Sequence, residues 1–220
     1  MSIKKVIAIG DSFLAGSELT DPKSTWPSLF ANKYQLEYVC LAKPGHTIQF
    51  VVRTLFETLH KESQDCLFVI HWPNALRMEY VDHQNDTWIQ INPNAILFGN
   101  EYSSEIQTMY YKHMNSLLGD KWHSLLMISS ALHILQQTNH RYVMTAVDDF
   151  MFDTTFHNPP YVEFLQASCQ DYIHWFDTMT FLKWTEANKF AIGQRGHPLE
   201  QAHQCAFEYF EPVYKKLIVL

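Results

Sequence analysis

Short apolar runs rich in β-branched residues alternate along this chain with amphipathic segments, and this alternation limits the folds open to it. We predict buried strands at 4–9, 36–40, 66–70 and 141–147. The clearest of the intervening helices is predicted at 47–61, where apolar residues recur along one helical face. Because strands separated by helices form a parallel sheet with both faces covered, we expect an α/β protein.

The remaining pattern predicts one domain spanning residues 1–220, a size that a single core can still support. Residues 79–100 are polar, Asn-rich and aromatic, which indicates an irregular excursion beside the sheet. The period of residues 103–138 predicts two helices separated near Gly119 and Asp120. Further helices are expected at 24–33, 161–176 and 200–217, and residues 178–193 show no clear pattern.

Charge and composition exclude several classes of partner. The formal charge is −7 with a pI near 5.9, and Lys and Arg are scattered, so we expect no nucleic-acid partner. The apolar run at 6–9 is too short for a signal peptide, and no stretch approaches the roughly 20 residues of a membrane helix. We therefore expect a cytoplasmic protein without a membrane span; its oligomeric state is not indicated. The four cysteines are far apart and form no CxxC pair. We therefore expect them to be small buried apolar residues.

Four segments place candidate site residues just beyond a predicted strand or before a predicted helix, and ligands of parallel sheets bind at the carboxyl ends of the strands. Ser12 follows the first strand in the run Gly-Asp-Ser, Gly45 follows the second, and Asn74 follows the third. His197 precedes a proline at the entrance to the last helix. Each has a structural alternative, such as a capping serine, a turn glycine or a helix cap. Their joint occurrence in this order favours a serine nucleophile with backbone and amide donors for an oxyanion.

These segments resemble the four sequence blocks of the SGNH (GDSL-type) hydrolase superfamily of esterases and lipases, including members from bacteriophages and bacteria. The resemblance implies a flavodoxin-like three-layer α/β/α sandwich with a mostly parallel central sheet. It implies Ser12 as nucleophile and His197 as base. It also implies an oxyanion hole formed by the backbone amides of Ser12 and Gly45 and the side chain of Asn74.

One departure concerns the acid of the catalytic triad. Gln194 stands three residues before His197, where the family has an aspartate. Asp148 or Asp149, after the fourth strand, could supply the missing carboxylate. A backbone carbonyl or the Gln194 amide oxygen could instead orient the imidazole, or the site could be degenerate.

The expected activity is hydrolysis of a carboxylic ester through an acyl-enzyme on Ser12, with an O-acetylated glycan or a small acyl ester as substrate. Trp72 and Trp88 could line the cleft, or they could only pack against the sheet. The alternatives are a binding or structural protein on the same fold and an acyltransferase. The 12 histidines form no HExxH motif, so we expect no metal and no cofactor.

Overall fold

The centre of the protein is a four-stranded parallel sheet. A computed structural model describes residues 3–91 and 105–219. The strands are β1 (Lys5–Ile9), β2 (Glu37–Cys40), β3 (Cys66–Trp72) and β6 (Arg141–Ala146), in the spatial order β2-β1-β3-β6. Every neighbouring pair is parallel, so the carboxyl ends of all four strands meet at one edge.

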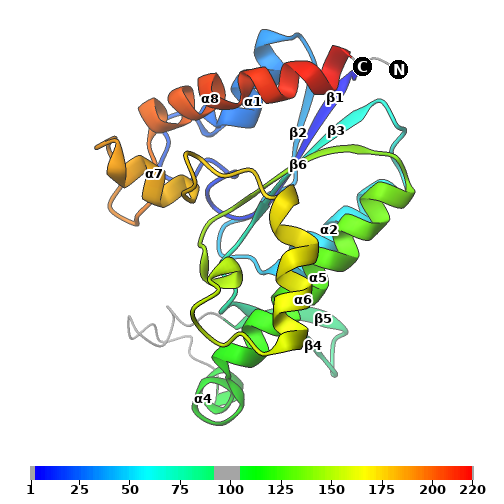
Figure 1. Ribbon diagram of the computed structural model, residues 1–220, viewed down its shortest axis with the longest axis vertical. Helices are drawn as coiled ribbons and strands as arrows, with labels where there is room; N and C mark the ends of the chain where they lie inside the picture. The colour runs from blue at the N-terminus through cyan, green and yellow to red at the C-terminus, as the bar shows by residue number, and fades with distance from the viewer. Residues whose placement is uncertain (1–2, 92–104, 220) are drawn as a thin grey trace.

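Helices cover both faces of this sheet (Figure 1). One face packs against α1 (Trp26–Lys33) and α8 (Glu200–Val219), and the other against α2 (Ile48–Leu59), α5 (Leu117–Gln137) and α6 (Pro160–Cys169). The chain is therefore a flavodoxin-like three-layer α/β/α sandwich, as expected. In the described ranges, no helix is long and apolar enough to cross a membrane.

Alternation along the strands divides the core into two clusters. Val6 and Ala8 of β1 pack with α1 and α8, whereas Ile7 and Ile9 pack with α2 and α5. All four side chains are fully buried. Because successive strand residues point to opposite faces, an apolar run without polar alternation is what a doubly covered strand requires.

Part of the expected irregular excursion at 79–100 is regular. β4 (Met78–Asp82) and β5 (Thr87–Ile91) form an antiparallel hairpin, and residues 92–100 lie outside the described ranges. The hairpin is fixed to α2 by Arg53, whose guanidinium lies 4.0 Å from the centre of the Trp88 ring and 3.2 Å from the Glu79 carboxylate. The β-forming residues flanking its turn explain the strands, and their polar neighbours obscured the pattern.

The expected helix break near Gly119 lies earlier in the chain. α4 (Glu105–Met109) runs into a π-helical turn, η2 (Tyr110–Met114), and α5 then begins at Leu117. Ser116 caps α5, because its hydroxyl accepts a hydrogen bond from the Gly119 N–H. Gly119 therefore lies in the first turn of α5 and separates no helices.

The remaining elements are short helices: η1 (Pro22–Ser24), η3 (Phe150–Phe152), η4 (Gln170–Tyr172) and α7 (Phe181–Ala187). Two of the predicted helix boundaries differ from the structure. The helix expected at 161–176 ends at Cys169, and the unassigned segment 178–193 contains α7. Beyond α6, Ile173 forms a parallel bridge with Met144 at the β6 edge of the sheet.

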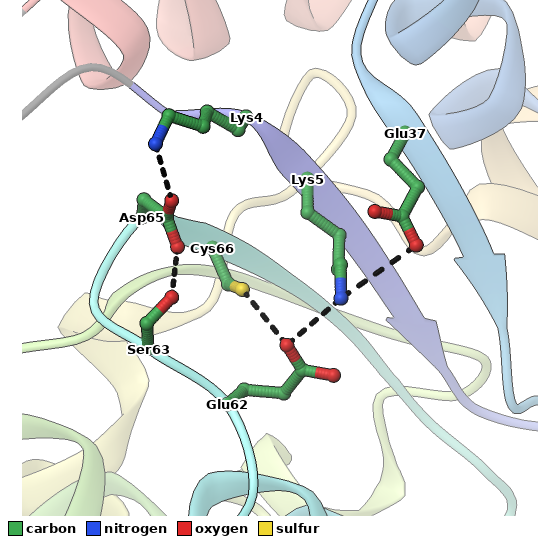
Figure 2. Close-up of polar contacts among 7 residues, drawn as sticks. All are labelled: Lys4, Lys5, Glu37, Glu62, Ser63, Asp65 and Cys66. Carbon is green, nitrogen blue, oxygen red and sulfur yellow. Dashed lines mark hydrogen bonds and ion pairs between the residues drawn. The ribbon is translucent and has the colours of Figure 1, made fainter.

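A polar network lies at the amino ends of the strands, opposite the edge that carries Ser12 (Figure 2). The Lys5 ammonium lies 2.9 Å from the Glu62 carboxylate and 3.6 Å from that of Glu37. The Cys66 thiol donates to Glu62 at 3.5 Å, and burial raises the pKa of this thiol to about 12. Cys66 is therefore an unreactive structural thiol.

The four cysteines are free, and they differ in burial. Cys66 and Cys169 are buried, as expected of small apolar residues. Cys40 is exposed, because it ends β2 at the edge of the sheet, and Cys205 is intermediate.

Candidate active site

Ser12 lies in a tight turn at the carboxyl end of β1. The turn is fixed by hydrogen bonds from the Ala15 N–H to the Asp11 carbonyl and from the Ser17 N–H to the Ser12 carbonyl, both 3.0 Å. Gly10 is required at its start, since a Cβ atom there would lie 2.9 Å from the His71 carbonyl oxygen in β3. Ser12 itself is 5% exposed, so the turn shields it from bulk water on most sides.

The loop after β2 is held against this turn. The Lys43 N–H donates to the Gly10 carbonyl at 3.1 Å, which joins the two strand ends. Two residues later Gly45 has a φ of +76°, a conformation that favours glycine. Gly45 therefore allows the chain to turn before it enters α2.

Asn74, at the end of β3, uses one side-chain atom locally and leaves the other available. Its Oδ1 accepts a hydrogen bond from the Leu76 N–H at 2.9 Å, and its carbonyl accepts from the Arg77 N–H at 3.3 Å. This Asx turn fixes the amide plane. Within residues 3–91 and 105–219 no hydrogen bond is seen from its Nδ2 group, which carries two N–H bonds.

Arg77 ties the three strand-end loops together. Its Nη1 lies 2.7 Å from the carboxylate of Asp11, the neighbour of Ser12, and 3.3 Å from the carbonyl of His46, the neighbour of Gly45. The Asp11 side chain is fully buried and that of Arg77 is 13% exposed. This ion pair fixes the relative positions of the residues expected to form the oxyanion hole.

His197 approaches this group from the other end of the chain. Its ring packs edge-on against the ring of Phe13, the residue after Ser12, at a centroid distance of 5.4 Å. Its Nδ1 lies 2.6 Å from Oε2 of Glu18. With Nδ1–H donating to a carboxylate, Nε2 keeps the lone pair that a general base needs.

Glu18 is the carboxylate that contacts His197, and no motif in the sequence indicates this role. Its oxygens also accept the Arg195 N–H at 2.9 and 3.0 Å and the His197 N–H at 3.4 Å. The hydrogen bond from His197, followed by those from the backbone, lowers the pKa of Glu18. Gly193 makes room for it, because a Cβ there would lie 2.6 Å from the Glu18 carboxyl carbon.

The two carboxylates expected at His197 lie elsewhere. Asp148 accepts from the Phe150 N–H at 3.1 Å, and burial raises its pKa to about 6. Asp149 pairs with the Lys183 ammonium at 2.6 Å. Both follow β6, which β3 separates from β1, whereas the carboxylate that contacts His197, Glu18, comes from the turn after β1. Gln194 is exposed, and the imidazole nitrogen contacts Glu18 instead.

Two further histidines are buried beside this site and held neutral. Burial lowers the pKa of His71 to about 4 and that of His203 to about 3. His71 Nδ1 lies 2.6 Å from the Thr145 hydroxyl, and His203 Nδ1 accepts the Trp26 N–H at 3.3 Å. Both therefore stabilise the scaffold in their neutral forms.

The two tryptophans considered as cleft walls differ. Trp72 is fully buried in the core, so it lines no cleft, whereas Trp88 is half exposed on the β4–β5 hairpin. Among the residues that the structure describes, no three His, Cys, Asp or Glu side chains gather to hold a metal ion.

No protein-family model matches the sequence, and no curated protein matches it. Solved structures of esterases do resemble it across nearly the whole chain. The psychrotrophic esterase EstA from Pseudoalteromonas sp. has a TM-score of 0.54 at 12% identity, covering 99% of this chain and 100% of that one. A lipolytic G-D-S-L family protein from Veillonella parvula has a TM-score of 0.54 at 12% identity, covering 96% and 98%.

The acetyl xylan esterase AlAXEase has a TM-score of 0.51 at 12% identity, covering 95% of this chain and 98% of that one. These identities are too low to carry an activity over, but the shared fold extends from end to end. The central parallel sheet flanked by helices agrees with these structures. The chain therefore has the fold of the SGNH (GDSL-type) hydrolases.

Proposed function

We propose that the protein is a serine ester hydrolase in which Ser12 is the nucleophile and His197 the general base. The observation that carries the proposal is the contact between His197 Nδ1 and the Glu18 carboxylate. It supplies the acid that Gln194 cannot, and it favours the imidazole tautomer that accepts a proton on Nε2. It also argues against a degenerate site.

In the first half of the reaction, the Ser12 hydroxyl attacks the carbonyl carbon of the ester while His197 Nε2 takes its proton. The carbonyl oxygen becomes an oxyanion that accepts hydrogen bonds from the backbone N–H groups of Ser12 and Gly45 and from Asn74 Nδ2. His197 then gives the proton to the leaving alkoxide, and the acyl group stays on Ser12.

Water completes the reaction by the same groups. His197 takes a proton from a water molecule while the water oxygen attacks the carbonyl carbon of the acyl-enzyme. The proton then passes to Ser12 Oγ as the bond to the acyl group breaks, and the free acid leaves. Glu18 touches no reacting atom: it holds the imidazole and stabilises its cation, so it is a positioning residue. The substrate class proposed is a small acyl ester or an O-acetylated glycan.

The test is hydrolysis of p-nitrophenyl acetate by the purified protein, measured beside Ser12→Ala and His197→Ala. We expect turnover in the parent protein and its loss in both variants, with unchanged circular dichroism. Turnover that survives in Ser12→Ala would refute the nucleophile. Added alcohol acceptors distinguish hydrolysis from acyl transfer, because a transferase gives the new ester in place of the free acid.

A further inference from the structure

A polar cavity of about 520 Å³ lies beyond the carboxyl end of β6. Its volume is within the range of ligand-binding pockets, about 300–1,000 Å³. Polar side chains from the loop after β6 and from the segment between α6 and α7 supply most of the lining: Asp149, Asp153, Thr154, Gln170 and Thr178. All of these except Asp153 are exposed, so the cavity opens to solvent.

Helix α7 spans the distance between this cavity and Ser12. The Phe181 ring of α7 lies 6.3 Å from the ring of Phe13, the neighbour of Ser12, and the Lys183 ammonium lies 2.6 Å from the Asp149 carboxylate. Since β6 is two strands from β1 and neighbouring strands lie about 4.8 Å apart, strand spacing places the cavity about 10 Å from the Ser12 turn. A ligand that occupies both places is therefore larger than a simple ester of acetic acid.

The loop that forms one wall of the cavity is held by two buried polar side chains. Lys121 of α5 is fully buried, and its ammonium donates to the carbonyls of Asp153 at 2.5 Å and Phe156 at 2.7 Å. Gln166 of α6 is 2% exposed and donates to the carbonyls of Met151 at 2.9 Å and Asp153 at 3.1 Å. These contacts fix the wall in place before any ligand binds, which lowers the entropic cost of binding.

The charges around the cavity balance one another. Asp149 pairs with Lys183, and Asp153 Oδ1 accepts hydrogen bonds from the Thr155 hydroxyl at 2.6 Å and the Thr155 N–H at 2.7 Å. These hydrogen bonds, followed by the ammonium groups of Lys121 and Lys183, lower the pKa of Asp153. Two carboxylates therefore lie near two ammonium groups, an arrangement that favours a neutral ligand over an ion.

Hydrogen-bonding groups and aromatic rings remain for such a ligand. The side chains of Thr154, Gln170 and Thr178 make no hydrogen bond to the part of the chain that the structure describes. The rings of Phe152 and Trp175 also line the cavity, with centres 5.5 Å apart. A sugar ring offers hydroxyl groups to the polar side chains and C–H groups to the aromatic rings, whereas an alkyl chain would leave the polar groups unpaired.

We propose that this cavity is a subsite for a neutral sugar, which belongs to the alcohol part of the ester and does not itself react. The proposal rests on the proposed function and selects the O-acetylated glycan over the small acyl ester. With the acetyl group at Ser12, the glycan extends along the carboxyl edge of the sheet and reaches Trp175 and Gln170.

The first test measures binding without catalysis. The Ser12→Ala protein is titrated by calorimetry with xylohexaose, cellohexaose and mannohexaose, which are neutral and differ in the geometry of their hydroxyl groups. At least one should bind saturably, and Trp175→Ala in the same background should weaken that binding about tenfold or more. Trp122→Ala is the matched control, since Trp122 is 37% exposed on α5 and lies outside the cavity lining. No saturable binding by any of the three, or a loss with Trp122→Ala in place of Trp175→Ala, would overturn the proposal.

Gln170→Ala is a second variant that leaves the core untouched, because Gln170 is exposed. For a partially O-acetylated form of the hexaose that binds, kcat/KM should fall about threefold to tenfold, mainly through KM, since one hydrogen bond is lost. Hydrolysis of p-nitrophenyl acetate should stay unchanged. Gln137→Ala, exposed at the end of α5, should match the parent protein with both substrates. An equal fall on both substrates in Gln170→Ala, or no fall on the glycan ester, would contradict the subsite.

Failure of the subsite and failure of the proposed function give different results. Glycan binding that depends on Trp175, without hydrolysis by the parent protein, would refute the proposed function and support the subsite. Hydrolysis of p-nitrophenyl acetate that depends on Ser12, without glycan binding, would support the function and overturn the subsite.

Discussion

The Glu18 carboxylate accepts three N–H groups from residues 195 and 197, so it orders the His197 loop and orients the imidazole together. The backbone of Glu18 has a φ of +67°, and Gly193 has no Cβ that would clash with the carboxylate, so both features allow the Glu18 side chain to lie against this loop. The sequence predicts Ser12, Gly45, Asn74 and His197 from their order along the chain. It does not reveal Glu18, because a contact between residues 179 positions apart leaves no periodic pattern.

Glu18→Gln should lower kcat about 10²–10⁴-fold with little change in KM, since the amide can favour the wrong imidazole tautomer. The melting temperature should stay close to that of the parent protein, which separates orientation of the ring from folding. Because the pKa of Glu18 is lowered, its carboxylate stays ionised above pH 4.5, and the difference between parent and variant should persist from pH 8 to pH 5. An unchanged kcat would show that Glu18 has no positioning role.

Gly193→Ala tests the same contact from the opposite side. The new Cβ would lie 2.6 Å from the Glu18 carboxyl carbon, so the carboxylate or the loop must move and kcat should fall at least tenfold. Gly119→Ala is the control, because its Cβ would meet only ordinary contacts at 3.5 Å. Steady-state kinetics on p-nitrophenyl acetate decide the outcome, and equal activity of the two variants would contradict the account.

At the scale of elements, the four strands of the parallel sheet were predictable as short apolar runs, and α2 was predictable from its apolar helical period. The β4–β5 hairpin was not, since three of its side chains with β-forming character, Val81, Trp88 and Ile89, are exposed and leave no clear alternation of buried apolar and exposed polar residues. The break before α5 was placed at a glycine, whereas the cap formed by Ser116 determines it. A serine alone does not predict a cap of this kind, because serine is also common in turns and loops.

Arg77 joins the loops after β1, β2 and β3, so its removal should act on all three. Arg77→Met leaves Asp11 buried without a cation, and we expect the free energy of unfolding to fall by about 3 kcal/mol. Asp11→Asn in the same chain removes the unpaired charge and should restore much of that loss. Urea denaturation of the single and double variants measures both effects, and strict additivity would contradict the coupling.

For the whole molecule, we expect the burial of neutral histidines to determine how the free energy of unfolding changes as the pH falls. The folded pKa values of His71 and His203, about 4 and about 3, lie below the unfolded value near 6.5. Their contribution to the free energy of unfolding is complete above pH 6.5 and is lost as the pH falls through their pKa values in the folded protein. Asp148 acts in the opposite direction, since its raised pKa of about 6 makes its charge a cost at neutral pH that acid relieves.

The stability that His71 and His203 lose in acid exceeds the stability that Asp148 gains, so the melting temperature should fall steadily from pH 7 to pH 4.5. His203→Gln should flatten this fall, and Asp148→Asn should steepen it by removing the opposing contribution. Calorimetry across this range measures all three proteins. A melting temperature that rises on acidification would show that these buried groups do not control stability.

The proposed activity depends on a serine made nucleophilic by its surroundings, and covalent labelling measures that property without a choice of substrate. Treatment with a fluorophosphonate should add one phosphonyl group to the parent protein, located at Ser12 by mass spectrometry of its peptides. His197→Ala should label at least 100-fold more slowly, and Ser12→Ala should not label. A parent protein that stays unmodified, or carries the label on another residue, would contradict the account.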